Sequence, residues 1–457
     1  MAIKLAIGEE FFDSLRESGS YYVDKTGLIR DLVAANNTVS LFTRPRRFGK
    51  TLTMSMIHSF FDITRDSREV FKGLDVAAHE DFCKAWMNQY PVVFITLKDA
   101  EGATFDLAYK KLKAIIASFC IRNSDLGNSK KTNIKDRQTF DRLAAKTADD
   151  EEVQNSLVTI MRMMQAVYGK PVILLIDEYD VPLAKARDHG FYPQMLDVIR
   201  GLLSTSLKSN DYLKFAVITG CLRIAKESIF TGVNNFKSYS VVDEAFSQYF
   251  GFTEKEVNDL LAAANETQYA ETIREWYDGY IFGDTRVYCP WDVVNFVADA
   301  RGRESFEPKN YWKNSSGNGI IREFAEDERF QVGDQFETLL NGGTVTKTVS
   351  DELTYETLKL TEDNLWSVLV MTGYLTKSDP GQTGNTVALK IPNREISAIF
   401  EETVMRLFAD TVDTEKVRSL TEALWNGDEN TASEILSDLL LDTISYNDYH
   451  EDYYHAF

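Results

Sequence analysis

The segment from Arg44 to Thr51 joins a basic run to the ending Gly49-Lys50-Thr51. It follows a predicted strand and opens a predicted helix, where backbone N–H groups and a helix N-terminus can together hold a phosphate. In such loops the lysine reaches the β- and γ-phosphates of a nucleotide, and the next hydroxyl binds Mg²⁺. We therefore expect nucleotide contacts from the whole loop, with Thr51 as a metal ligand: Arg44, Pro45, Arg46, Arg47, Phe48, Gly49, Lys50 and Thr51.

One position of this loop departs from the usual pattern G-x-x-x-x-G-K-[ST]. Arg44 stands where the first glycine belongs, so a side chain occupies a place that usually needs close backbone approach. The alternative interpretation of these eight residues is a basic loop followed by a helix, without a ligand.

A second motif is the apolar run Val172–Asp177, a predicted buried strand that ends in two carboxylates, Asp177 and Glu178. Sheets of this class place their ligands at the carboxyl ends of strands. Asp177 would hold Mg²⁺ through a water, as in a Walker B strand, and Glu178 would orient and deprotonate the attacking water. The alternative is that the two carboxylates only mark an ordinary boundary between a strand and a loop. The presence of a Walker A-like loop in the same chain argues against this alternative.

A third candidate strand ends in Thr219, with Arg223 four residues later. A polar side chain at that strand end is well placed to sense the γ-phosphate. Arg223 would stabilise the charge that develops in phosphoryl transfer, in the same chain or from a neighbouring subunit. We assign both residues a catalytic role, and a solvated loop residue is the alternative for each.

The elements that must position these groups alternate short apolar runs with longer amphipathic stretches over the first 250 residues. This rhythm predicts an α/β fold, with a parallel sheet of the P-loop NTPase type and flanking helices. The apolar runs are nearly continuous, as in strands buried on both faces. The predicted strands are Thr38–Thr43, Val92–Leu97, Val172–Asp177, Phe215–Gly220 and Ser238–Val242, and the predicted helices include 51–63, 104–120, 152–168 and 193–208.

Other segments of the chain do not follow this alternating pattern. The polar segment from Asn123 to Glu152 predicts an exposed loop with one short helix. After Phe250 two helices are expected, and Thr253 with Glu256 forms a capping box at the start of the first. The predicted division is a P-loop ATPase-like domain (1–250), a helical lid (251–325), a winged-helix-like α+β subdomain (326–400) and an acidic helical tail (401–457).

The charge is strongly negative and unevenly placed. The 457 residues contain 50 Lys and Arg against 70 Asp and Glu, a net charge of −20, and residues 401–457 alone carry −11. Such a tail repels phosphate backbones, so nucleic acid is not expected as a partner of this chain alone. The four cysteines lie far apart, which predicts free thiols in a reducing compartment. Without an apolar run of bilayer-spanning length, we expect a cytoplasmic protein that does not bind membranes.

Several motifs together resemble one known family, the AAA-ATPase-like proteins that are commonly fused to a C-terminal PD-(D/E)XK nuclease. The resemblance covers nearly the whole chain, and RPRRFGKT, with Arg in the first-glycine place, resembles the family's own version of the loop. These motifs are YYVDKTGLIRDLV (21–33), LFTRPRRFGKTLTMSM (41–56), LLIDEYDVPL (174–183), ITGCLRIAKESIFTGVNNF (218–236), FGFTEKEV (250–257), EWYDGYIFG (275–283), VYCPWDVVNF (287–296), YWKNSSGN (311–318) and LKIPNREI (389–396).

The resemblance implies a Mg²⁺-dependent ATP-binding protein, a slow ATPase that acts as a nucleotide-driven conformational switch or regulatory module. The alternatives are a catalytically weak nucleotide-binding scaffold, or the ATPase half of a DNA-processing nuclease. The only Glu-x-Lys, at Glu307, contains a proline that a central nuclease strand would not tolerate. Nuclease activity is therefore not expected from this chain, whereas a protein partner or a second copy is.

Overall fold

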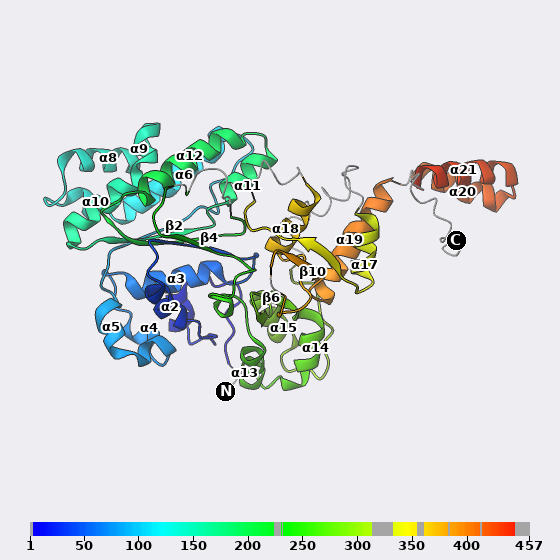
Figure 1. Cartoon of the computed structure of the whole chain (residues 1–457), viewed down its shortest axis with the longest axis horizontal. Helices are drawn as coiled ribbons and strands as arrows, with labels where there is room; N and C mark the ends of the chain where they lie inside the picture. Colours follow the sequence, from blue (N-terminus) through cyan, green and yellow to red (C-terminus); the bar gives the residue numbers. More distant parts are fainter. Residues whose placement is uncertain are drawn as a thin grey trace.

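A computed structural model describes residues 3–223, 230, 232–312, 332–353, 361–382, 384–411 and 414–443. Its centre is a five-stranded parallel sheet between two layers of helices, which confirms the predicted α/β fold (Figure 1). The strands are β1 (Val39–Thr43), β2 (Val92–Thr96), β3 (Val172–Asp177), β4 (Leu213–Gly220) and β5 (Phe236–Tyr239).

Four helices of the two layers correspond to the predicted stretches 51–63, 104–120, 152–168 and 193–208. One layer contains α2 (Gly27–Ala35), α3 (Lys50–Phe61), α4 (Arg68–Phe71) and α5 (Glu80–Trp86), and α1 (Phe12–Glu17) packs against α3. The opposite layer contains α6 (Phe105–Arg122), α10 (Ser156–Tyr168), α11 (Val181–Asp188) and α12 (Tyr192–Leu207).

Strands β1 and β3 and most of β4 are buried on both faces, since successive side chains point to opposite sides of the sheet. The edge strand β5 is only partly buried. Leu174 and Ile176 of β3 belong to the core under α6, α10 and α12, whereas Ile173 and Leu175 belong to the core that includes α3. The continuous apolar runs of the sequence therefore serve two separate cores.

The strand order is β2-β3-β4-β1-β5. Along the sequence, β2 lies between β1 and β3, as predicted. In the sheet, however, the strand between β1 and β3 is β4, and β2 is an edge strand. The order brings the carboxyl ends of β1, β4 and β3 side by side, so Thr219 at the end of β4 lies next to Asp177 at the end of β3.

The prediction of an exposed loop over 123–152 is wrong. This segment forms three short helices, α7 (Asp125–Asn128), α8 (Ile134–Ala144) and α9 (Asp150–Gln154). Phe140 and Leu143 of α8 are buried against the same core as α10. The apolar residues are few, but they fall on one face of a helix and are sufficient to dock it.

The region after the sheet contains α13 (Glu254–Ala264), α14 (Ala270–Tyr277) and α15 (Pro290–Ala300). The capping box of Thr253 and Glu256 at the start of α13 is confirmed. A hairpin of β6 (Tyr280–Phe282) and β7 (Thr285–Val287), which was not predicted from the sequence, precedes α15. The aromatic residues of this region pack as core: Tyr277, Tyr280 and Tyr288 are buried.

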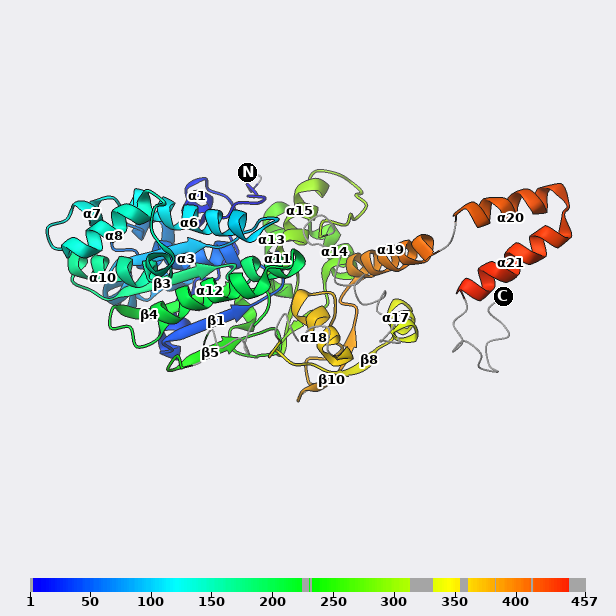
Figure 2. The ribbon, with the colours of Figure 1, turned by 90° about the horizontal axis from the view of Figure 1, so that it is seen from above.

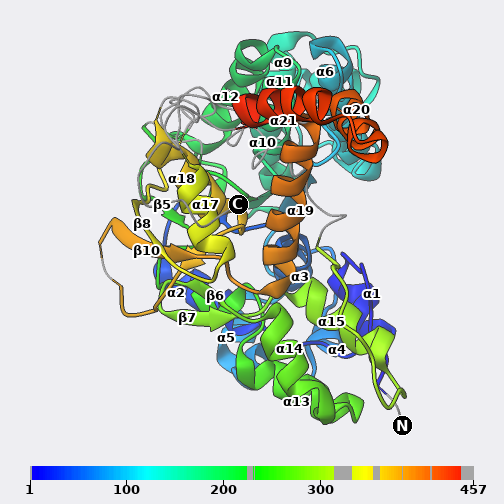
Figure 3. The same ribbon diagram turned by 90° about the vertical axis from the view of Figure 1, so that its right-hand side faces the viewer.

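A three-stranded antiparallel sheet follows, made of β8 (Val345–Thr348), β10 (Thr386–Lys390) and β9 (Thr376–Lys377), with α17 (Gly333–Leu340) and α18 (Glu362–Thr372) beside it. Helix α19 (Arg394–Thr411) leads away from this region to α20 (Thr414–Asn426) and α21 (Glu429–Thr443), which pack on each other apart from the rest of the molecule (Figure 2). Figure 3 shows α19 passing from the neighbourhood of α14 toward this pair. Among the described helices, none is both long and apolar enough to cross a bilayer.

Candidate functional site

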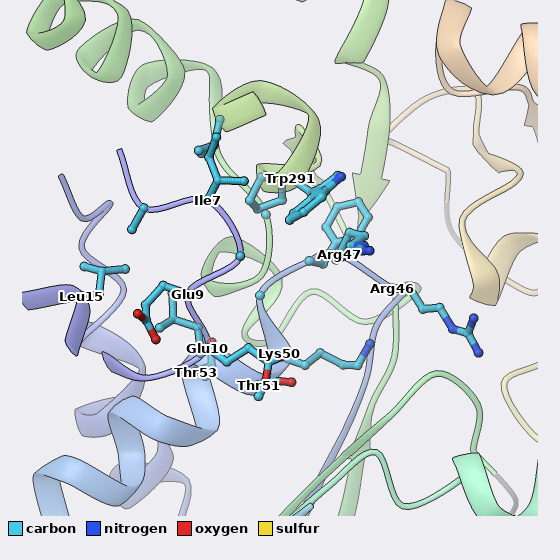
Figure 4. A pocket seen from close by; sticks show the side chains of 18 of the residues that line it. Ile7, Glu9, Glu10, Leu15, Arg46, Arg47, Lys50, Thr51, Thr53 and Trp291 are labelled. Atoms are coloured by element: carbon cyan, nitrogen blue, oxygen red, sulfur yellow. The ribbon is translucent and has the colours of Figure 1, made fainter. Parts of the chain in front are cut away.

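A pocket of about 520 Å³ opens at the carboxyl ends of the central strands (Figure 4). Its walls come from segments far apart in the sequence: the N-terminal residues 5–10, the loop and first turn of α3, the acidic strand end, and the start of α15. The lining residues used below are Leu5, Ile7, Glu10, Arg46, Arg47, Lys50, Thr51, Glu178, Phe252, Trp291 and Val294.

Lys50 is buried at the base of the loop, and its ammonium lies among oxygen atoms. Its Nζ donates to the carbonyls of Arg44 (3.1 Å) and Pro45 (3.0 Å) and lies 3.6 Å from Glu178 Oε1. Burial disfavours the charged form, but Cys221, Glu178 and the neighbouring carboxylates more than offset this and raise the pKa of Lys50 above its usual value. The lysine therefore stays charged.

Thr51, Asp177 and Thr219 form a connected group at the adjacent strand ends. Thr51 donates from Oγ1 to Asp177 Oδ2 over 2.8 Å, and Thr219 donates to the other carboxylate oxygen. Asp177 is fully buried, and desolvation together with the charge of Glu178 raises its pKa. The structure thus brings together two groups whose oxygen atoms can bind a metal ion, the Thr51 hydroxyl and the Asp177 carboxylate.

Glu178 follows β3 with a left-handed backbone, at φ +55°. Side chains other than glycine rarely adopt this conformation, and where they do it often marks a functional turn. The turn is fixed by hydrogen bonds from Tyr179 N to Thr219 O and from Val181 N to Glu178 O. It directs the Glu178 carboxylate into the pocket, toward Lys50.

Comparison with known proteins assigns a family to the part of the chain that contains this site. Residues 6–230, which include the loop, the acidic strand end and the whole of β4, match a family model described as "Predicted AAA-ATPase". The matched region belongs to this family. The chain is also 26% identical over 414 residues to an uncharacterised protein encoded in the vnfD 5' region of Azotobacter chroococcum mcd 1, which covers 88% of this chain and 70% of that protein.

Within the AAA-ATPase region, Arg44 does not act as predicted. Its side chain is completely buried and points away from the pocket, donating to the carbonyls of Thr43 (2.9 Å) and Tyr239 (2.8 Å). The guanidinium also lies over the rings of Phe250 and Phe282. Desolvation lowers its pKa to about 9. Arg44 contributes only its carbonyl, as the acceptor for Lys50, and leaves the phosphate side of the loop clear.

The other loop residues divide into two sets. Pro45 and Phe48 face the interior; Pro45 offers its carbonyl to Lys50, and Phe48 packs its ring against Tyr280 and Phe282. Arg46 and Arg47 line the pocket and point in different directions (Figure 4). Gly49 has φ +79° and begins α3, so its left-handed backbone is a conformation that favours glycine.

Arg47 connects the loop to α15. Its guanidinium lies 4.0 Å from the centre of the Trp291 ring, a cation–π contact, and its carbonyl is 3.8 Å from the Cys289 thiol. The motif around Trp291 was not assigned to the site from the sequence. The only signal was the pair Pro290-Trp291 at a helix start, which does not distinguish a pocket wall from a core.

Two further residues near the strand ends have structural partners. Asp180 is buried, and its Oδ2 accepts the backbone N–H groups of Cys221 (2.9 Å) and Leu222 (3.0 Å); desolvation raises its pKa to about 6. Arg223 does not line the pocket. Its guanidinium pairs with Asp351 Oδ2 (3.2 Å) and Glu352 Oε1 (3.6 Å), beyond β8. The structure therefore does not bring Arg223 to the loop.

A buried carboxyl pair lies behind the Arg47 contact. Asp292 is in the first turn of α15 and Glu395 is in the first turn of α19, and both are essentially inaccessible to solvent. The backbone N–H of Trp312 donates to Glu395 Oε1 at 2.7 Å. Burial raises the pKa of both carboxyls, and the charge of Asp292 raises that of Glu395 further. The pair joins the helix that carries Trp291 to the helix that leads toward α20.

Proposed function

We propose that this chain binds ATP together with Mg²⁺ in the 520 Å³ pocket, hydrolyses it slowly, and changes conformation with its nucleotide state. The observation that carries the proposal is that Lys50, Thr51 and Glu178 line one cavity and that Asp177 accepts a hydrogen bond from Thr51. Each group has a role that phosphoryl transfer requires: phosphate binding, metal binding and orientation of the attacking water.

The oxygen donors fit Mg²⁺. The ion prefers oxygen ligands and is commonly bound by one or two protein groups, with phosphates and waters completing the shell. The Thr51 hydroxyl and the Asp177 carboxylate, 2.8 Å apart, supply such a set, and no cluster of three or more acidic, histidine or cysteine ligands occurs among the described residues. When bound, Mg²⁺ would neutralise the charge that develops on the phosphates.

The other end of the pocket is apolar and suits a nucleobase. Leu5, Ile7, Phe252 and Val294 line it, together with the ring of Trp291. A flat aromatic base gains from apolar burial and stacking. The distribution of polar and apolar walls therefore supports binding with the phosphates at the loop and the base toward the N-terminal segment.

The contact between Lys50 and Glu178 supports slow turnover. Before ATP binds, the two side chains neutralise each other at 3.6 Å. A γ-phosphate would compete for the Lys50 ammonium and release the Glu178 carboxylate, which could then accept a proton from water. The ion pairs of Arg223 with Asp351 and Glu352 keep a further cation away from the phosphates.

Three variants test the proposal by equilibrium dialysis with ATP and by release of inorganic phosphate. Lys50→Ala should abolish ATP binding. Glu178→Gln should retain binding but lose about 100-fold or more in turnover, the usual contribution of a general base. Lys84→Ala, which changes an exposed lysine on α5, should behave as the wild type. Absence of ATP binding by the wild type would refute the proposal, and ATP binding by the wild type without release of phosphate would identify a nucleotide-binding scaffold instead.

A further inference from the structure

The edge of the sheet formed by β2 is open for hydrogen bonding beyond Tyr90, whose backbone pairs with Phe61 and Ile63. Ile173 N donates to Pro91 O and Leu97 N donates to Asp177 O, both at 2.9 Å, so the odd-numbered residues of this strand face β3. The backbone groups of Phe94 and Thr96 consequently face away from β3. No backbone group in the described part of the chain pairs with them on that side. Unpaired edge groups of this kind are a template for another strand.

A groove of about 900 Å³ follows this edge. One wall is a face of α3, where Ser55, His58 and Asp62 line the groove. The other wall is a face of α6, where the lining residues recur every three or four positions from Lys111 to Arg122. Residues with this spacing lie in a row along a helix, so the groove runs along both helices. A single extended chain matches a long groove between two helices with a strand edge as its floor.

The chemistry of the groove is mixed. Phe94, Ile115 and Phe119 supply apolar surface, as a strand with alternating apolar side chains would require. Arg65 forms ion pairs with Asp13 and Asp62.

The remaining charges lie at the ends and on one wall. His58 Nε2 lies 3.2 Å from Asp62, and Asp99 lines the groove beyond the end of β2. Lys111 and Arg122 are both exposed, and neither pairs with an acidic group within the described ranges. Eleven positions on a helix span about 16 Å, the length of about five residues of a strand. The α6 wall therefore favours an occupant with acidic side chains four to six residues apart.

We propose that this groove binds an extended segment of a partner protein, which adds to the sheet as a further strand beside β2. Its backbone would pair with Phe94 and Thr96, its apolar side chains would pack on Phe94, Ile115 and Phe119, and its carboxylates would lie opposite Lys111 and Arg122. This site is separate from the nucleotide pocket and lies on the other side of the N-terminal segment, where Glu10 lines the pocket and Phe11 lines the groove.

The test uses the full chain and a phage-displayed library of dodecapeptides with alternating apolar and acidic residues. Retained peptides are synthesised with a fluorescent label and titrated by fluorescence polarisation. The double variant Lys111→Glu with Arg122→Glu should weaken binding about tenfold or more, as reversal of two opposed charges implies. Lys110→Glu, on the same helix but outside the groove, should bind as the wild type.

Two further reagents test the backbone pairing. Thr96→Pro removes an N–H that faces the groove and no bond to β3, so it should weaken binding while the unfolding temperature stays near that of the wild type. Should this variant fail to fold, the peptide is changed instead, by N-methylation of every second residue in one of two alternate patterns. Only the pattern that blocks the N–H groups facing β2 should abolish binding. The proposal is refuted if no peptide is retained, if the charge-reversal variant binds equally, or if sedimentation shows a dimer of the chain occupying this edge.

Discussion

The guanidinium of Arg47 lies 4.0 Å from the centre of the Trp291 ring. This contact joins the loop of the AAA-ATPase region to α15, a helix outside the matched residues 6–230. Both side chains line the pocket, so a bound nucleotide would touch them directly. A nucleotide bound there, as proposed, would thus contact the C-terminal half of the molecule through Trp291.

We predict that Trp291 reports nucleotide binding. ATP in the pocket would alter the Arg47 contact and the environment of the indole, and the intrinsic tryptophan fluorescence should change on titration. Trp291→Phe should lose most of this signal. Trp425→Phe, which alters a tryptophan that is 90% exposed on α20, should keep it. An unchanged signal in Trp291→Phe would contradict the assignment of this residue to the pocket.

Arg44 should be required for stability and not for nucleotide binding. Arg44→Gly, which restores the usual glycine, removes two hydrogen bonds and the side chain between Phe250 and Phe282. We expect a loss of about 2–4 kcal/mol in the free energy of unfolding, measured with urea. Arg44→Met fills most of the same volume and should lose less, since a buried charge is often replaceable by an apolar side chain. Equal stability of Arg44→Gly and the wild type would refute this.

The carboxyl pair of Asp292 and Glu395 should make stability depend on pH. Because burial raises both pKa values, the folded protein holds protons that the unfolded chain releases above its ordinary carboxyl pKa near 4. The stabilisation from these protons is fully present below the unfolded-state pKa near 4, and it is lost as the pH rises through the raised pKa values of the folded protein. The free energy of unfolding should fall between about pH 5 and pH 8, by at most about 1.4 kcal/mol per pH unit for each proton.

Glu395→Gln removes one of these titrations, so its stability should fall less steeply over the same range. Glu337→Gln, an exposed change on α17, is the matched control and should follow the wild type. Urea unfolding at four pH values measures the slopes. Parallel slopes for Glu395→Gln and the wild type would show that the pair does not carry a proton in the folded protein.

Release of Arg223 should increase ATP turnover. The double variant Asp351→Asn with Glu352→Gln removes both ion-pair partners of Arg223. We expect kcat to rise about fivefold, because that factor corresponds to the free energy of one ordinary ion pair. Arg223→Ala should lower kcat without changing ATP affinity. Asp379→Asn, an exposed acid near the β9–β10 hairpin, serves as control. If Arg223→Ala leaves kcat unchanged, Arg223 is only a structural link between the two sheets.

Four strands of the central sheet were predictable because each is a nearly continuous apolar run, and β3 coincides with its prediction from Val172 to Asp177. Strand β5, which contains Lys237, lies at Phe236–Tyr239 instead of the predicted Ser238–Val242. Hydrogen-bond partners in space were not predictable. The sequence places Arg44 in a phosphate loop, but its direction depends on the carbonyl of Tyr239, almost 200 residues away. Likewise, the wall formed by Trp291 depends on how α15 packs, and short-range patterns contain no information about this.

The helices α7 to α9 illustrate another limit. Their segment is polar overall, and composition favours a loop. Only a few buried contacts, such as those of Phe140 and Leu143, decide the outcome, and these contacts depend on a core that forms elsewhere in the chain.

Helix α19 begins beside the Asp292–Glu395 pair and contains 18 residues. At 1.5 Å per residue it is a rod of about 27 Å, and a tilt of about 10° at its first turn would move its far end by about 5 Å. A tilt of this size, as the proposed nucleotide-dependent change would allow, would move α20 and α21 by about the width of a side chain. In that case α19 would act as a lever arm between the pocket and the last two helices.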